Sequence, residues 1–208
     1  MDVHHERRLK PAEIVVEANT IGGDFGGKGY SIDEYALVYL AKASGRPVKS
    51  VTRYADELAA YNVRHASVSR LRTAVDADGK ILAHEARIVM DGGAYANAKP
   101  LPALAPAGGT AVMAAYNVPT VRISVQVAYT NTVPAGHVRS PGEVQAIFAG
   151  ESHLDIIARE LGMDPLEFRL RNVVRDGERG SLGDNFRENP GERLLKGAAD
   201  AIGWTKQR

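Results

Sequence analysis

The sequence predicts an α+β domain in which mixed sheets pack against helices. Near the N-terminus, an apolar run passes into a glycine-rich loop and then into a helical pattern. In the middle, Asp78 and Gly79 separate two alternating segments, which is a strong signal for a hairpin. The last third of the chain carries apolar residues at helical spacing. Strands in one part and helices in another indicate the α+β class.

The N-terminal quarter is expected to form a strand, a glycine loop, a helix and a second strand. The first strand follows from the apolar run within residues 13–18. Ser31 and Glu34 have the spacing of a capping box, so we expect a helix at 32–43. A glycine and a proline should end that helix, and a short strand should follow at 48–52.

The middle of the chain is predicted to be a hairpin of strands 65–76 and 80–91. With a two-residue turn, Thr73 faces His84, Leu71 faces Ala86 and Val75 faces Leu82. That register gathers one apolar face, formed by Leu71, Val75, Leu82, Ala86, Ile88 and Met90. His84 shares this face, and we interpret it as a hydrogen-bonded core histidine.

A long loop and a strand should follow the hairpin. Residues 92–109 are rich in Pro, Ala and Gly, and Lys99 is the only charged residue among them. Loops of this length are often functional. The alternation at 119–130 predicts a half-buried strand.

The C-terminal third is predicted to be helical. Apolar spacing indicates a helix at 142–161. Asp164 and Glu167 should then cap a short helix that has Pro165 in its first turn. A last short helix is expected at 192–204.

The domain division follows from a change in composition. Residues 175–190 are charged and glycine-rich with few apolar anchors, so we expect them to be mobile. We therefore predict one domain at 1–175, followed at 176–208 by a mobile polar segment and a short helix.

Composition indicates a globular domain and gives no sign of a highly charged partner. Hydrophobic residues make up 44% and charged residues 25% of the 208 residues, and the net charge is +1. This balance gives no sign of nucleic-acid or membrane binding. The chain has no cysteine, so it can form neither a disulfide nor a thiolate-held iron–sulfur cluster. A cytoplasmic location is the default expectation.

The glycine loop, at residues 22–28, reads GGDFGGK and allows several interpretations. Glycines let a backbone approach a ligand closely, and a loop before a helix can hold an anion. The spacing nearly matches a nucleotide-binding P-loop, but Gly29 stands where that motif needs a hydroxyl. A tight structural turn that binds nothing is the third alternative.

A second motif, at residues 130–145, reads TNTVPAGHVRSPGEVQ. Together with the glycine loop, it resembles the molybdopterin-binding large subunit of the molybdenum hydroxylases, the xanthine dehydrogenase and aldehyde oxidase family. The similarity runs from about residue 9 to residue 174. It implies one lobe of a molybdenum-cofactor-binding domain, with molybdenum–molybdopterin as its cofactor. The resemblance implies cofactor contacts from the loop and from one arginine, namely Gly23, Asp24, Phe25, Gly26 and Arg139, with no side chain ligating the metal.

Departures from the family's sequence pattern narrow the range of expected substrates. Asp24 stands where many members have glycine, and a carboxylate beside a phosphate-bearing cofactor is electrostatically awkward. Gly29 and Pro141, on the substrate side, replace the glutamate and the aromatic clamp of purine-oxidising members. Ala107 lies near the position of their substrate arginine. Purines are therefore disfavoured, and the resemblance leaves aldehydes, aromatic N-heterocycles or another small molecule, hydroxylated with oxygen derived from water.

The resemblance also implies partners. The family's upstream glutamine and downstream glutamate base align with no residue of this chain, so we expect an N-terminally truncated lobe that is inactive alone and carries no catalytic residue. The second molybdopterin-binding lobe, the iron–sulfur clusters and FAD would lie on partner domains or subunits, and the isolated chain should form a homo-oligomer. A non-catalytic binding or interaction domain derived from the family is the alternative.

Overall fold

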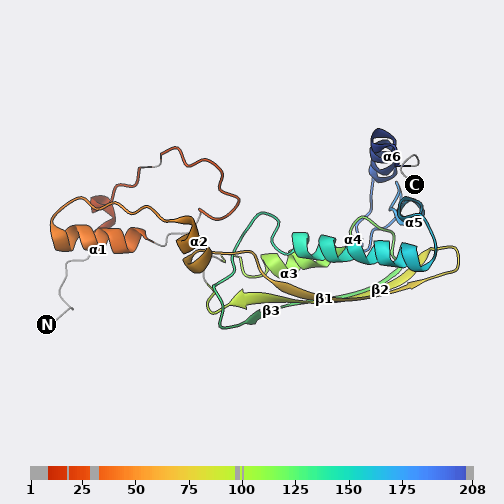
Figure 1. Cartoon of the computed structure of the whole chain (residues 1–208), viewed down its shortest axis with the longest axis horizontal. Helices are drawn as coiled ribbons and strands as arrows, with labels where there is room; N and C mark the ends of the chain where they lie inside the picture. The colour runs from red at the N-terminus through yellow and green to blue at the C-terminus, as the bar shows by residue number, and fades with distance from the viewer. Residues whose placement is uncertain (1–8, 18, 29–32, 97–98, 100, 205–208) are drawn as a thin grey trace.

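The computed structural model describes residues 9–17, 19–28, 33–96, 99 and 101–204. Figure 1 shows a long sheet with helices α3 (Leu104–Gly109) and α4 (Glu143–Glu160) along one face. Helices α5 (Pro165–Asn172) and α6 (Gly191–Ile202) stand at one end of the sheet. Beyond the other end extends an N-terminal arm, the described residues 9–60. The α+β class with a mixed sheet and packed helices is confirmed.

The sheet has three strands in the order β1-β2-β3. Strands β1 (Ser67–Val75) and β2 (Ile81–Gly93) are antiparallel, whereas β3 (Thr120–Tyr129) runs parallel to β2. The parallel pair requires a crossover, which α3 and the 3-10 helix η3 (Thr110–Met113) supply. The hairpin and the strand predicted at 119–130 are therefore confirmed.

The predicted register holds until the last residue of β1. Thr73 faces His84 and Leu71 faces Ala86, but an irregularity between Ala74 and Val75 brings Val75 opposite Ile81. The prediction that Leu82 faces Val75 and joins the core is wrong, since Leu82 is 48% exposed and Ile81 is fully buried. A shift of one residue moves a side chain to the other face of a sheet.

The core lies between the sheet and its helices. Its largest fully buried side chains come from β2, η3, α4 and α5, and they include Ile81, Ile88, Met90, Met113, Leu154 and Phe168. His84 belongs to this layer, as predicted. It is 2% exposed, and its Nδ1 lies 2.9 Å from Thr73 Oγ1, which also lies 2.9 Å from His153 Nε2.

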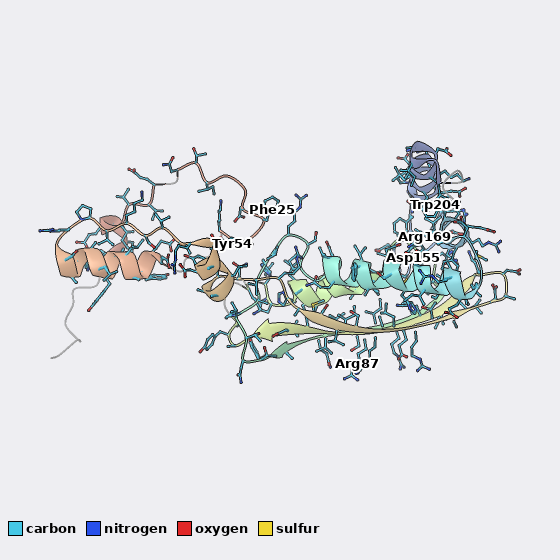
Figure 2. All side chains as sticks on the ribbon, in the orientation of Figure 1. Phe25, Tyr54, Arg87, Asp155, Arg169 and Trp204 are labelled. Carbon is cyan, nitrogen blue, oxygen red and sulfur yellow. The ribbon has the colours of Figure 1, made fainter. Side chains whose placement is uncertain are left out.

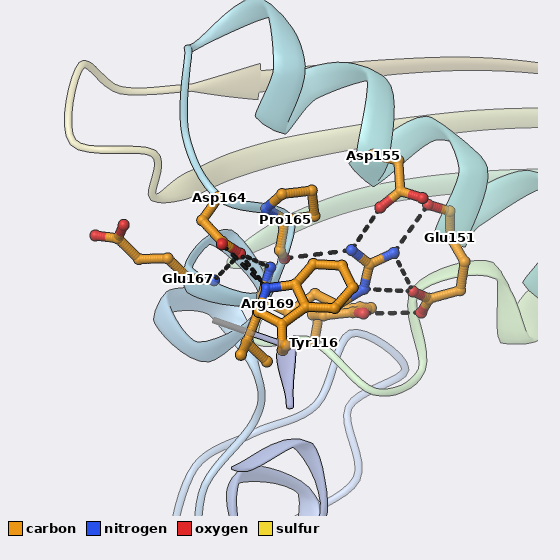
Figure 3. A network of polar contacts seen from close by, with 9 residues as sticks. Tyr116, Glu151, Asp155, Asp164, Pro165, Glu167 and Arg169 are labelled. Atoms are coloured by element: carbon orange, nitrogen blue, oxygen red, sulfur yellow. Dashed lines mark hydrogen bonds and ion pairs between the residues drawn. The ribbon is translucent and has the colours of Figure 1, made fainter. Parts of the chain in front are cut away.

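A polar cluster fastens α5 to α4 (Figure 3). The Arg169 guanidinium lies 2.8 Å from Glu151 and 2.6 Å from Asp155 on α4. The Tyr116 hydroxyl donates to Glu151 Oε1 at 2.8 Å, and burial, followed by the Glu151 charge, raises the pKa of Tyr116. Beside this cluster, Asp164 caps α5 as predicted, because its carboxylate accepts from the Leu166 and Glu167 amides.

The other predicted helices are confirmed with small changes in their ends. Helix α1 (Glu34–Ser44) stops at Gly45, whose φ of 62° is left-handed. Its N-cap is Asp33, whereas Ser31 lies outside the described residues. Helix α4 fills the range predicted at 142–161, and α6 fills most of 192–204.

Two predicted strands are absent from the described residues, and one predicted loop has the wrong length. Residues 13–18 and 48–52 form no strand where the structure describes them, and the first of these ranges begins within the 3-10 helix η2 (Pro11–Glu13). An unpredicted helix, α2 (Tyr54–Ala60), follows the second range. The loop predicted at 92–109 is shorter, because β2 extends to Gly93 and α3 begins at Leu104.

The segment 175–190 contains no helix or strand, but it is attached to the rest of the fold. Ser181 is buried and its hydroxyl donates to the Met113 carbonyl at 2.9 Å. The Asn189 side chain donates to the Val174 carbonyl at 3.0 Å. The mobility of this segment and the domain boundary at residue 175 stay predictions. No helix within the described part of the chain is long and apolar enough to cross a membrane.

Candidate functional site

The fold brings the two sequence motifs into direct contact. The Arg139 amide donates to the Phe25 carbonyl at 2.7 Å, although the two residues are far apart in the sequence. Next to Phe25, a Cβ atom on Gly26 would lie 2.2 Å from the His137 carbonyl oxygen, closer than real Cβ atoms come. Glycine at this position is therefore required for the loop to reach the second motif.

The glycine loop contains a β-turn closed by the bond from the Gly27 amide to the Asp24 carbonyl, at 2.9 Å. Both central residues are left-handed, with φ of 52° at Phe25 and 94° at Gly26, as in a type I′ turn. A left-handed phenylalanine costs on the order of 1–3 kcal/mol. The Phe25 side chain, labelled in Figure 2, is 65% exposed, and its ring lies against Gly23 of the same loop, since a Cβ on Gly23 would lie 2.8 Å from Phe25 Cε2. Phe25 is therefore not a core aromatic, and strain of this kind is typical of functional sites.

The Asp24 carboxylate turns back into its own loop. Its Oδ1 accepts from the Lys28 amide at 2.5 Å and its Oδ2 from the Gly26 amide at 3.2 Å. The Lys28 ammonium donates to the Ile21 carbonyl. The carboxylate that looks electrostatically awkward in the sequence is thus balanced by two amide donors of the loop itself.

The second motif forms a tight turn in front of α4. Ser140 and Gly142 have left-handed φ values of 59° and 83°. Arg139 is exposed, and its guanidinium has no hydrogen bond or ion pair with any residue that the structure describes. Pro141 is half-buried beside α3, since a Cβ on Gly108 would lie 2.0 Å from the Pro141 carbonyl oxygen. Gly29, the other predicted substrate-side residue, lies outside the described residues.

The segment between α2 and β1 supports this turn, and its residues were not identified from the sequence. Arg64 donates to the Arg139 carbonyl at 3.0 Å and Asn62 donates to the His137 carbonyl at 3.2 Å. Val63 pairs with Ala135 in an isolated bridge. These contacts join residues more than seventy positions apart, so no local pattern could have revealed them.

A further contact holds the first turn of α4 to the start of β1. Gln145, the last residue of the second motif, donates through Nε2 to the His65 carbonyl at 2.8 Å. His65 is 4% exposed, and burial is the main cause of its lowered pKa. Gln145 thus connects this buried residue to the motif that carries Arg139.

An open cavity of about 390 Å³ adjoins the glycine loop. The loop contributes Asp24, Gly27 and Lys28 to its lining, and α2 and its C-terminal flank contribute Leu58 and Tyr61. No three His, Asp or Glu side chains among the described residues come together as a metal site. The region therefore offers a ligand the loop backbone and the polar side chains of the cavity lining, such as Tyr61 and Arg64, and the exposed Arg139 guanidinium lies on the adjoining turn.

Sequence comparison identifies one family. The model for the molybdopterin cofactor-binding domain matches residues 3–173. A probable xanthine dehydrogenase component from Bacillus subtilis is 36% identical over 82% of this chain and 23% of its own length. The aldehyde oxidoreductase of Megalodesulfovibrio gigas is 34% identical over 84% of this chain and 19% of its own length. The nicotinate dehydrogenase large molybdopterin subunit of Eubacterium barkeri is 29% identical over 96% of this chain and 48% of its own length. The chain spans less than half the length of these curated relatives.

Solved structures share the fold. The aldehyde oxidoreductase from Desulfovibrio gigas superposes with a TM-score of 0.80 at 30% identity, over 93% of this chain and 21% of that one. The quinoline 2-oxidoreductase from Pseudomonas putida 86 gives a TM-score of 0.81 at 29% identity, over 90% and 25%. Because the family match contains both motifs that meet at Phe25 and Arg139, this chain belongs to the molybdopterin cofactor-binding domain family of the molybdenum hydroxylases.

Proposed function

We propose that this chain is the lobe of a molybdenum hydroxylase that holds one side of the molybdenum–molybdopterin cofactor. Arg139 would contact the cofactor through its guanidinium, and Gly23, Asp24, Phe25 and Gly26 would lie beside it. The observation that carries the proposal is the exposed Arg139 guanidinium, which has no partner among the described residues and lies on a turn bonded to the Phe25 carbonyl.

The residues fit such a guest. A guanidinium presents a fixed fork of donors that suits phosphate and other oxygen-rich groups. The glycines of the loop leave its backbone open to close approach. The Asp24 carboxylate is satisfied by the Gly26 and Lys28 amides, so less of its charge faces outward. When bound, the molybdenum centre would supply the oxidation chemistry that hydroxylates a carbon with oxygen derived from water.

The substrate class follows from the substrate-side residues and the relatives. We infer aldehydes or N-heterocycles for the whole enzyme, because Gly29, Pro141 and Ala107 lack the side chains that would hold a purine. Relatives are named an aldehyde oxidoreductase and a nicotinate dehydrogenase, which supports both classes. Such an enzyme would need a second molybdopterin-binding lobe, iron–sulfur clusters and FAD on other domains or subunits.

The exposed arm supports packing against such partners. Helix α1 has no buried residue, and Val15, Val16 and Tyr35 are 81%, 87% and 80% exposed. Without a partner lobe, the chain would cover this apolar surface by forming a homo-oligomer. Two alternative functions, a nucleotide-binding P-loop protein and a non-catalytic binding domain derived from the family, are not favoured. The Lys28 ammonium is bonded to the Ile21 carbonyl rather than held free for a nucleotide, and the family match includes the whole loop.

The test compares two variants in a complete subunit rebuilt around this lobe. Arg139→Ala should lose cofactor, because each charge-assisted hydrogen bond contributes about 1.5–3 kcal/mol. Phe25→Leu should retain more cofactor, because its backbone contact remains. Arg193→Ala, an exposed arginine on α6, is the matched control. Molybdenum and pterin content per polypeptide is measured after gel filtration. Equal content in wild type, Arg139→Ala and Phe25→Leu would disprove the role of Arg139.

A further inference from the structure

The outer face of the sheet, opposite α3 and α4, carries charged residues in ordered rows. Cross-strand pairing places Arg72, Glu85 and Arg122 side by side, one on each strand. Both arginines approach the same carboxylate, with Nη1 of Arg72 and of Arg122 each 3.8 Å from Glu85. In this row a single carboxylate therefore lies between two guanidiniums.

The next row lacks its carboxylate. Arg70 on β1 pairs directly with Arg87 on β2, and Ser124 of β3 lies beside Arg87. Neither arginine has a hydrogen bond or ion pair with any described residue, and Figure 2 shows Arg87 pointing away from α4. Like charges placed directly opposite one another destabilise a sheet. The sequence thus places a repulsive pair on an exposed face.

We propose that this outer face is a docking surface for a protein that places an Asp or Glu side chain between Arg70 and Arg87. The neighbouring row shows the same chemistry within the chain, because at the β2 position taken by Arg87 in this row it has Glu85, a carboxylate that faces a guanidinium from each neighbouring strand. Arginine binds carboxylates with two parallel hydrogen bonds, which suits this role better than lysine does.

The row on the other side adds apolar contact. Val68, 63% exposed, pairs with Val89, and Gln126 lies beside Val89 on β3. Arginine is enriched in protein interfaces, and the centre of an interface is more apolar than the rest of the surface. The Glu85 carboxylate within the same face, and the overall charge of only +1, disfavour a nucleic acid as the occupant.

The first experiment measures anisotropy of three labelled probes with the 208-residue chain at low salt: hexaglutamate, hexaglutamine and hexathymidylate. Hexaglutamate should bind most tightly. The double variant R70Q/R87Q should weaken its binding at least about tenfold, as expected for one lost charge-assisted contact. R46Q/R193Q removes the same charge from exposed positions elsewhere and should change binding less than about twofold. No binding of hexaglutamate, an equal loss in both variants, or tighter binding of hexathymidylate would overturn the proposal.

A second variant supplies the missing carboxylate within the chain. R87E places a glutamate opposite Arg70, as Glu85 stands opposite Arg72. It should raise the melting temperature by about 1–4 °C and abolish hexaglutamate binding. R193E controls for the change in net charge. A melting temperature of R87E at or below that of wild type would show that Arg70 and Arg87 do not repel, which contradicts the comparison with the row of Glu85.

Discussion

Replacing Gly142 by alanine tests the packing that positions Arg139. Gly142 ends the turn of the second motif with a φ of 83°, and its Cβ would lie 2.0 Å from the Ala105 carbonyl oxygen and 2.8 Å from the Gly109 amide. Alanine would suffer left-handed strain of about 1–2 kcal/mol. It would also push α3 away from the turn, and overpacking of this kind costs about 1–3 kcal/mol. We expect Gly142→Ala to lower the free energy of unfolding by roughly 2–5 kcal/mol.

Urea unfolding followed by far-UV circular dichroism measures this effect, with Gly162→Ala as the matched control. Gly162 is also left-handed, with φ of 64°, but no atom lies within 4 Å of its Cβ position. The control therefore suffers only the backbone strain, and the difference between the variants reports the close approach of α3. If Gly142→Ala costs no more than Gly162→Ala, then α3 does not pack on the turn and does not position Arg139.

Two further predictions concern the body of the fold. Asn172 is fully buried and bonds to Ile81 N, Gly79 O and Phe168 O at 2.8, 2.8 and 2.9 Å, so Asn172→Ala should cost about 2–4 kcal/mol in urea unfolding; a loss below about 1 kcal/mol would contradict these bonds. Burial, helped by His153, lowers the pKa of His84 from 6.5 to about 4. The unfolded chain then binds a proton that the buried His84 does not, so the contribution of His84 to the free energy of unfolding should fall as the pH drops from 6.5 towards 4 and change no further below that. His84→Gln should remove this part of the pH dependence, and an unchanged slope in the variant would refute the assignment.

The register of the hairpin was predictable because local and tertiary preferences agree there. The Asp-Gly turn and the alternation of apolar residues both select the pairing of Thr73 with His84. The irregularity at Ala74 and Val75 was not predictable. The amide of Ile81 donates to the Asn172 side chain, which comes from α5 at the far end of the chain. A contact at such sequence separation leaves no trace in the local pattern.

The two predicted strands of the arm fail for a different reason. An apolar run indicates that a segment is to be buried, but a strand also needs a neighbour to accept its hydrogen bonds. No described residue pairs with 14–17 or 48–52. Both runs instead remain at the surface, where Val15 is 81% and Val51 is 75% exposed. In the described part of the chain, the apolar character of these runs therefore leads neither to burial nor to a strand.

Asp24 shows that a sequence motif can predict where a site lies without predicting the charge environment within that site. From the sequence, a carboxylate in a loop expected to face phosphate groups implies repulsion, since Coulomb energy depends on the distance between charges. The electrostatic energy of the carboxylate also depends on the hydrogen-bond donors that surround it. The turn with Phe25 and Gly26 in left-handed conformations directs the Gly26 and Lys28 amides onto that carboxylate. A glycine at position 24 would have no side chain to accept these donors. The same residue that disagrees with the family pattern therefore holds the loop in the conformation whose Phe25 carbonyl meets Arg139.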